Sequence, residues 1–292
     1  MVSTETTIAA ANVRVTHDKE RNLRRFGELI EEAAARGVDF LVFPELALQG
    51  YADLAFAQDT PEAAEQKRYY FHEAEAVPGP AIEALCAYAQ RFGMVIQMGL
   101  AERALHGNLI YNSAVVVGPE GVAGVYRKIH NQFEYPYFMP GASHGLFDMP
   151  FGRVGALICY DICFPELPRA YALGGADIVS VSTAWPMQGH DPAVDYYGWG
   201  MDFATQATAF FNQLWVVISN HAESGAYSTG VDYYGRSQIV GPFGKVVAEA
   251  AQDECLVVHT ADLRGEVLRS RTEGLFGKNF LQDRQPERYA EP

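Results

Sequence analysis

The sequence predicts an α/β fold in one domain. Two features support this: segments with helical periodicity alternate with short apolar runs of strand length, and one pair of strand-like runs is joined by turn residues. These features fit a mixed sheet, or two packed sheets with helices outside, and periodicity does not choose between the two. Since no glycine- or serine-rich linker divides the 292 residues, we expect a single domain over residues 1–292.

The chain opens as a βαβ unit. Residues 6–13 are short and β-prone, and residues 21–36 carry apolar side chains at helical spacing. Gly37 is a typical helix end. Residues 40–43 are wholly apolar, which suits a strand buried on both faces, and Pro44 ends that strand.

The alternation continues to residue 220. Helices are expected at residues 81–92, 165–173 and 196–212. Strands are expected at residues 94–100, 112–117, 122–126, 154–158, 177–182 and 215–220. Pro119-Glu120-Gly121 predicts a hairpin between two of these strands. The residues from about 264 onward are charged and only weakly periodic.

Composition limits the possible partners. The formal net charge of −14 is spread along the chain, so nucleic acid is not an expected partner. No segment is apolar for long enough to cross a bilayer, and the N-terminal residues lack a signal-peptide pattern, so we expect no membrane partner and a cytoplasmic location. The four cysteines are expected to be thiols.

Three reactive side chains each end a strand-like run. LVFPE ends at Glu45, VYRK at Lys128 and GALIC at Cys159. Sites in α/β sheets form at the carboxyl ends of strands, so the three side chains are expected to converge. An acid, a cation and a thiol together are the components of acyl-transfer chemistry.

Each of these residues alone has an ordinary structural explanation. A cysteine that ends an apolar strand is more often core filler than nucleophile. Glu45 after a proline suits a cap, and Lys128 beside Arg127 suits a solvated edge. The sequences that flank these three residues favour a catalytic role over the structural explanations.

The segments FPELALQGY, YRKIHNQFEYPYFMPG and ALICYDICFPELPRAYALGGADI resemble the signature segments of the nitrilase, or carbon-nitrogen hydrolase, superfamily. They occur in the family's order, and weaker similarity covers nearly the whole chain. The resemblance implies an α-β-β-α four-layer sandwich that forms a homodimer or higher homo-oligomer through its helical faces and its C-terminal tail. It also implies a Glu45–Lys128–Cys159 triad, with Glu134 as a second glutamate. We expect the reaction to need no metal or organic cofactor.

The chemistry of these residues agrees with that role. A strand-to-helix turn and a nearby ammonium group are expected to favour the Cys159 thiolate. Glu45 would take the thiol proton and pass it to the leaving nitrogen. Lys128 and the backbone N–H of Tyr160 would face the oxyanion, where one donor is typically worth about 3 kcal/mol.

The resemblance favours an amidase. Cys159-Tyr160-Asp161 is the form common among amidases, whereas nitrile-cleaving members carry Cys-Trp-Glu. Ile162 and Cys163 stand where N-carbamoyl amino acid hydrolases tend to have arginines. We therefore expect a small, neutral or cationic amide as substrate. An N-carbamoyl hydrolase, a nitrilase, an acyltransferase and a binding protein on a retired enzyme fold remain alternatives.

Four aromatic residues are candidates for the substrate pocket: Tyr51, Tyr137, Tyr160 and Trp185. Ordinary core packing explains each of them equally well. Cys163 lies four residues after Cys159, but no second Cys or His pair follows at ligand spacing, so a metal site is not expected. His130 and His221 are isolated in sequence and receive no role.

Overall fold

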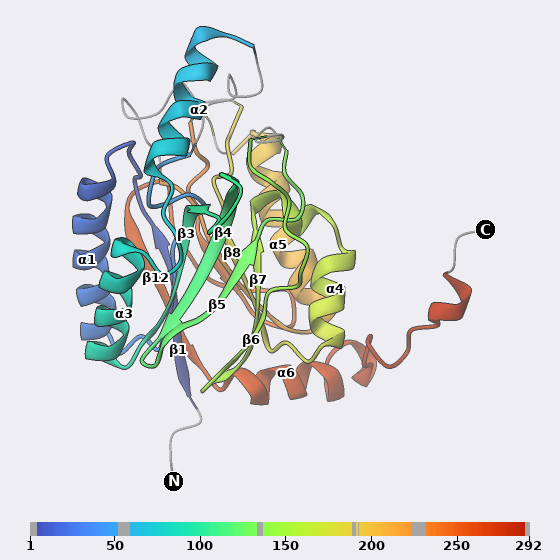
Figure 1. The fold of residues 1–292 in the computed structure, drawn as a ribbon. Helices are drawn as coiled ribbons and strands as arrows, with labels where there is room; N and C mark the ends of the chain where they lie inside the picture. The colour runs from blue at the N-terminus through green and yellow to red at the C-terminus, as the bar shows by residue number, and fades with distance from the viewer. Residues whose placement is uncertain are drawn as a thin grey trace.

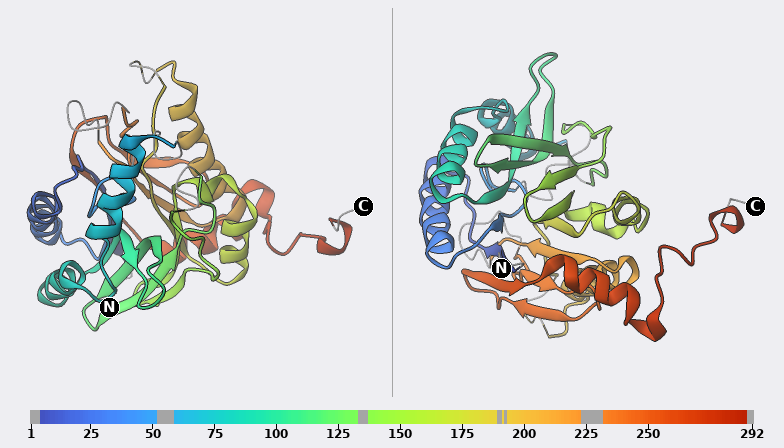
Figure 2. Two further views of the ribbon diagram at one scale, coloured as in Figure 1. Left: turned by 45° about the horizontal axis from the view of Figure 1, so that its top comes forward. Right: turned by 90° about the horizontal axis from the view of Figure 1, so that it is seen from below.

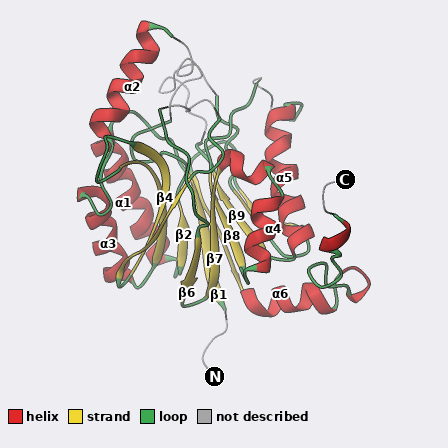
Figure 3. Cartoon of the chain, turned by 45° about the vertical axis from the view of Figure 1, so that its right-hand side comes forward, coloured by secondary structure: helices red, strands yellow, loops and turns green. Residues whose placement is uncertain are grey.

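The computed structural model describes residues 5–51, 59–132, 137–188, 191, 193–222 and 232–289. Two six-stranded mixed sheets lie between two layers of helices, so the predicted α-β-β-α four-layer sandwich is confirmed (Figure 3). The first sheet contains, in order, β12 (Cys255–Ala261), β1 (Thr6–Asn12), β2 (Phe40–Val42), β3 (Val95–Arg103), β4 (Ile110–Gly118) and β5 (Gly121–Arg127). The second contains β11 (Val246–Glu249), β10 (Gln238–Val240), β9 (Trp215–Ser219), β8 (Ile178–Ser182), β7 (Gly152–Ile158) and β6 (Leu146–Met149).

Most of the α-helices lie outside the two sheets (Figure 1). The α-helices are α1 (Lys19–Ala35), α2 (Pro61–Glu73), α3 (Pro80–Phe92), α4 (Glu166–Leu173), α5 (Tyr196–Asn212) and α6 (Leu263–Thr272). The 3-10 helices are η2 (Cys159–Cys163), η4 (Leu275–Gly277) and η5 (Pro286–Arg288). Helices α1 and α3 cover the first sheet, and α4 and α5 cover the second. Helices α2 and α6 lie at opposite ends of the molecule, at the top and the bottom of Figure 1.

The central strands are buried on both faces. Along β1, Ile8 and Ala10 pack between the two sheets, whereas Ala9 and Ala11 pack on the α1/α3 side. Successive side chains of a strand point to opposite faces, so a strand covered on both sides is apolar at most of its positions. This is why the predicted strands appear in the sequence as continuous apolar runs.

The parallel pairs give the two sheets the same plan. Strand β2 pairs in parallel with β1 and β3, and β8 pairs in parallel with β7 and β9. Antiparallel strands extend both sheets outward on each side. Because β5 is antiparallel to β4, which is antiparallel to β3, the carboxyl end of β5 lies at the same edge of the first sheet as that of β2.

The predicted elements up to residue 220 are present, with ends shifted by a few residues, and the hairpin at residues 119–121 is confirmed. Helices α2 and α6, and strands β6 and β10 to β12, were not predicted. Helix α2 buries only Ala63 and Tyr70, so it lacks the apolar stripe that periodicity detects. Helix α6 lies at the start of the charged tail, and it was missed because it too lacks a clear apolar stripe. The expected role of that tail in oligomer contacts stays a prediction.

Candidate active site

The structure brings Glu45 and Lys128 into direct contact. Glu45 lies three residues after β2, and Lys128 directly follows β5. Lys128 Nζ lies 2.7 Å from Glu45 Oε1, and both side chains are almost completely buried. A buried ion pair needs further hydrogen bonds to offset the loss of hydration.

Two other groups supply these bonds to the Glu45 carboxylate. Asn112 Nδ2 on β4 donates to Oε1 at 2.7 Å, and the backbone N–H of Ala184, which follows β8, donates to Oε2 at 3.1 Å. An ionised carboxylate only accepts hydrogen bonds, so three donors fit it well. Asn112 was missed by the sequence analysis, because an asparagine within a strand has no motif that marks it.

The main chain around Glu45 is packed closely against β3. A Cβ atom at Gly99 would lie 2.2 Å from the carbonyl oxygen of Pro44 and 2.8 Å from Glu45 Cα. The next residue, Leu46, has a φ of 45°, in the left-handed region. Only glycine at position 99 lets β3 approach this turn, so β3 fixes where the carboxylate lies.

Cys159 is the first residue of η2 and directly follows β7. Its φ is 45°, which is uncommon for a residue with a side chain, and its side chain is buried. Such a sharp turn from strand to helix presents a nucleophile at the end of a sheet. The buried Asp161 stabilises the turn, since its carboxylate accepts from the Ile158 N–H at 3.1 Å and from Tyr126 Oη at 2.8 Å.

The surroundings of Cys159 keep its thiol protonated. Burial raises the pKa of the Cys159 thiol well above its ordinary value, and the Glu45 carboxylate raises it further. Lys128, the Thr183 side chain and the Ala184 N–H act in the opposite direction and do not cancel the rise. Lys128 favours the thiolate, as expected, but burial, which that expectation left out, acts more strongly in the opposite direction.

His130, which follows Lys128 by two residues, is joined to η2. Its Nδ1 lies 2.8 Å from Asp161 Oδ1, and its backbone N–H donates to the same oxygen at 3.0 Å. Its ring stacks on Phe164, with centroids 3.7 Å apart. His130 thus links the segment that carries Lys128 to the turn that carries Cys159, a role that the sequence did not indicate.

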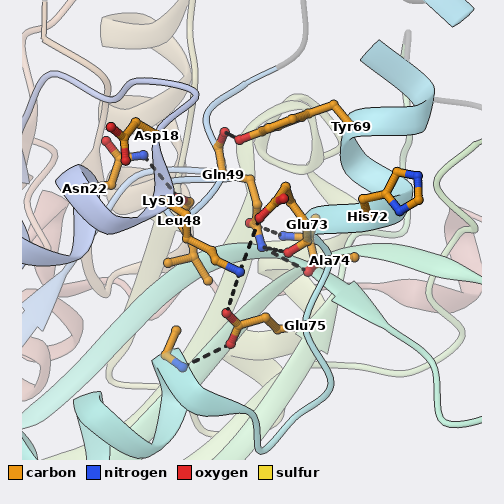
Figure 4. A network of polar contacts seen from close by, with 12 residues as sticks. Asp18, Lys19, Asn22, Leu48, Gln49, Tyr69, His72, Glu73, Ala74 and Glu75 are labelled. Atoms are coloured by element: carbon orange, nitrogen blue, oxygen red, sulfur yellow. Dashed lines mark hydrogen bonds and ion pairs between the residues drawn. The ribbon is translucent and has the colours of Figure 1, made fainter. Parts of the chain in front are cut away.

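A polar network joins the turn after Glu45 to α2 and α1 (Figure 4). Tyr69 Oη donates to the Gln49 carbonyl at 2.7 Å, and Gln49 Nε2 donates to the Glu73 carbonyl at 3.1 Å. Lys19 Nζ pairs with Glu75 at 3.0 Å and with Glu73 at 3.3 Å. The carboxyl end of α2 is therefore fixed to the same turn that carries Glu45.

The four aromatic candidates have different neighbours. The Tyr51 carbonyl accepts from His17 at 3.0 Å, Tyr137 lies under Lys67 Nζ at 4.1 Å, and Tyr160 packs edge-on against Phe164 at 5.0 Å. Trp185 directly follows Ala184 and packs against the core cluster that includes Cys159. Their role in substrate binding stays a prediction. Glu134 lies outside the described residues.

The part of the chain that the structure describes contains no group of three His, Cys, Asp or Glu side chains arranged to hold a metal ion. All four cysteines are free, and Cys163 is exposed. No helix among the described residues combines the length and apolar character that crossing a membrane requires.

Comparison with known proteins defines the class. Residues 7–270 match the family model described as carbon-nitrogen hydrolase. The chain is 34% identical to an (R)-stereoselective amidase of Pseudomonas sp., covering 92% of this chain and 87% of the amidase. It is 30% identical to an N-carbamoylputrescine amidase of Solanum lycopersicum, covering 97% and 93% of the two chains. The crystal structure of Nit3 of Saccharomyces cerevisiae, a member of branch 10 of the nitrilase superfamily, matches with a TM-score of 0.81 at 24% identity, over 95% of this chain and 97% of that one.

The chain belongs to the carbon-nitrogen hydrolase family, a class of enzymes that act on non-peptide C–N bonds.

Proposed function

We propose that the protein hydrolyses a small carboxylic amide to the acid and ammonia through a thioester on Cys159. The observation that carries this proposal is the position of the Glu45 carboxylate, which is bonded to Lys128 and close enough to the Cys159 thiol to raise its pKa. A protonated thiol beside a buried carboxylate suits a nucleophile that loses its proton only as it attacks.

In the first half-reaction, the Cys159 sulfur attacks the amide carbon as its proton passes to Glu45. The carbonyl oxygen becomes an oxyanion, which Lys128 and the Tyr160 N–H stabilise. The C–N bond then breaks, and Glu45 gives the proton to the departing nitrogen, so ammonia leaves as a neutral molecule. The acyl group remains on sulfur as a thioester.

In the second half-reaction, Glu45 takes a proton from water as the water oxygen attacks the thioester. The C–S bond breaks, the carboxylic acid leaves, and the proton returns to the Cys159 sulfur. The enzyme is regenerated without a metal or organic cofactor. Glu134 would assist by holding Lys128 and orienting the substrate amide.

Amides are the preferred substrate class because of the Cys159-Tyr160-Asp161 sequence, and the amidase from Pseudomonas sp. agrees with this. An N-carbamoyl amine is the second candidate, since the relative from Solanum lycopersicum is named for that activity. The two reactions differ in their products, because a carbamoyl substrate releases carbon dioxide as well as ammonia.

The test is ammonia release from a panel of amides, N-carbamoyl compounds and nitriles, with carbon dioxide measured in parallel. Cys159→Ala is expected to abolish release, and Cys163→Ala, four residues away and exposed, to retain it. Ammonia without carbon dioxide from an amide supports the proposal. If ammonia is released only from N-carbamoyl compounds or only from nitriles, the substrate class is that one and not the amides.

We also propose that the protein is a cytoplasmic homo-oligomer. Helix α5 exposes Tyr196, Trp199 and Phe203 on its outer side, which is unusual for a helix that faces water. The C-terminal segment that carries η5 extends away from the body of the molecule (Figure 2). A second copy of the chain would cover both features.

A further inference from the structure

The turn after β9 contacts both the segment that carries Glu45 and the segment that follows β8. Asn220 and His221 directly follow β9, and both side chains are buried. The Ala222 N–H donates to the Val13 carbonyl at 3.0 Å, so this turn reaches from the second sheet to the end of β1 in the first. Neither residue belongs to the proposed triad.

His221 holds the main chain of Glu45. Its Nε2 lies 2.7 Å from the Glu45 carbonyl oxygen, and a carbonyl can only accept, so Nε2 carries the hydrogen. Burial lowers the pKa of His221 to about 4, with the charge of His17 acting in the same direction. The ring is therefore neutral at neutral pH. It lies against Tyr233, with ring centroids 4.6 Å apart.

Asn220 holds the main chain of Trp185 from both sides. Its Oδ1 accepts from the Trp185 N–H at 2.7 Å, and its Nδ2 donates to the Trp185 carbonyl at 3.2 Å. The residue before Trp185 is Ala184, whose N–H bonds to Glu45 Oε2 and also lowers the pKa of Cys159. Asn220 therefore fixes the segment that contacts both the carboxylate and the thiol.

We propose that Asn220 and His221 are positioning residues that set the separation between the Glu45 carboxylate and the Cys159 thiol. This inference rests on the proposed function, in which these two groups exchange a proton. One turn holds the Glu45 carbonyl through His221 and the Ala184–Trp185 segment through Asn220. Proton transfer is sensitive to small changes in distance, so loosening either contact lowers the rate of reaction without removing a reacting group.

A matched pair of variants tests the His221 contact. Gln and Met have similar shapes, but only Gln retains a donor at the position of Nε2, and both lose the ring that packs on Tyr233. We expect His221→Met to lower kcat by roughly tenfold or more and to change KM by less than about twofold. His221→Gln is expected to restore most of kcat. Asn220→Ala is likewise expected to lower kcat with little change in KM. It serves as the test variant if His221→Met and His221→Gln both fold poorly.

A control separates positioning from the general cost of a lost buried hydrogen bond. Trp215 lies at the opposite end of β9, and its Nε1 donates to the Leu263 carbonyl at 3.1 Å. Trp215→Phe removes that buried bond far from Glu45, and it is expected to lower the melting temperature but to leave kcat nearly unchanged.

The rate of Cys159 alkylation by iodoacetamide as a function of pH provides a second readout. With Glu45 in place to accept the thiol proton, alkylation is expected to proceed at neutral pH. At neutral pH, the alkylation rate of His221→Met is expected to be lower than that of the wild type and close to that of Glu45→Gln. The alkylation rate of His221→Met is then expected to increase as the pH is raised. Suppose that Cys159→Ala is inactive, so that the proposed function holds. Equal kcat values and equal alkylation profiles for His221→Met, His221→Gln and the wild type would then overturn the inference. Activity in Cys159→Ala would instead reject the proposed function.

Discussion

The proposed proton exchange between Glu45 and Cys159 explains why the nucleophilic thiol lies buried beside a carboxylate, an arrangement that would otherwise disfavour catalysis. A buried thiol beside a carboxylate resists ionisation, and Cys159 has a raised pKa for both reasons. The same carboxylate is an acceptor for the proton that the thiol must lose. Lys128 and Asn112 keep it in place through bonds of 2.7 Å each to Oε1.

The role of Glu45 is tested by Glu45→Gln, which keeps the shape but cannot accept the proton. General-base catalysis typically contributes about 100-fold or more, so kcat at neutral pH is expected to fall by at least that factor. Glu120→Gln, in the exposed turn between β4 and β5, is the matched control. Retention of kcat in Glu45→Gln under conditions where Cys159→Ala is inactive would assign the base to another group.

His221 predicts a pH dependence of stability. Its pKa falls from 6.5 to about 4 on folding, so between these values the unfolded chain binds a proton that the folded chain does not. The free energy of unfolding should therefore decrease as the pH falls from 6.5 toward 4, by about 3 kcal/mol from this residue. Urea unfolding across that range should show a shallower loss in His221→Gln, and equal losses in the two proteins would refute the prediction.

Among the elements, β3 determines where the Glu45 turn can lie. A Cβ at Gly99 would meet the main chain of Pro44 and Glu45, whereas a Cβ at Gly118 on β4 would meet only Val95 Cγ2, at 3.9 Å. Gly99→Ala is expected to destabilise the protein by about 1–3 kcal/mol and to lower kcat, because it displaces the turn. Gly118→Ala should change neither quantity appreciably. Thermal unfolding and ammonia release measure both effects.

The sequence predicted the elements that carry Glu45, Lys128 and Cys159, because buried strands and amphipathic helices have clear periodicities. It missed α2, which is held by contacts such as Tyr69 with Gln49 rather than by an apolar stripe. The helix therefore depends on tertiary contacts that no local pattern records.

The sequence also missed the residues that support the site. Asn112, Asn220 and His221 act through hydrogen bonds to the Glu45 carboxylate, to Trp185 and to the Glu45 carbonyl. Each bond joins residues that are distant in sequence, so neither spacing nor composition points to it. The sequence also did not show that burial opposes the ionisation of Cys159, since it does not give the depth of burial.

At the scale of the whole molecule, the exposed aromatic side of α5 predicts association. Trp199 and Phe203 are exposed and stack on each other, with ring centroids 5.2 Å apart. Trp199→Glu places a charge in the proposed contact, and it is expected to shift the protein toward smaller species in size-exclusion chromatography with light scattering. Leu105→Glu changes an equally apolar residue that is 80% exposed in the loop between β3 and β4, and it should leave the size unchanged. A wild-type monomer would contradict the proposal.

The most direct test of the proposed function is to trap the thioester. An amide that the enzyme hydrolyses would be mixed with it, quenched with acid during turnover, and the cysteine-containing peptides analysed by mass spectrometry. We predict that the peptide containing Cys159 gains the mass of the substrate's acyl group on the Cys159 sulfur, both in the wild type and in Cys163→Ala. An acyl group found on Cys163 instead, or rapid turnover with no acyl group on Cys159 at any quench time, would contradict the thioester mechanism.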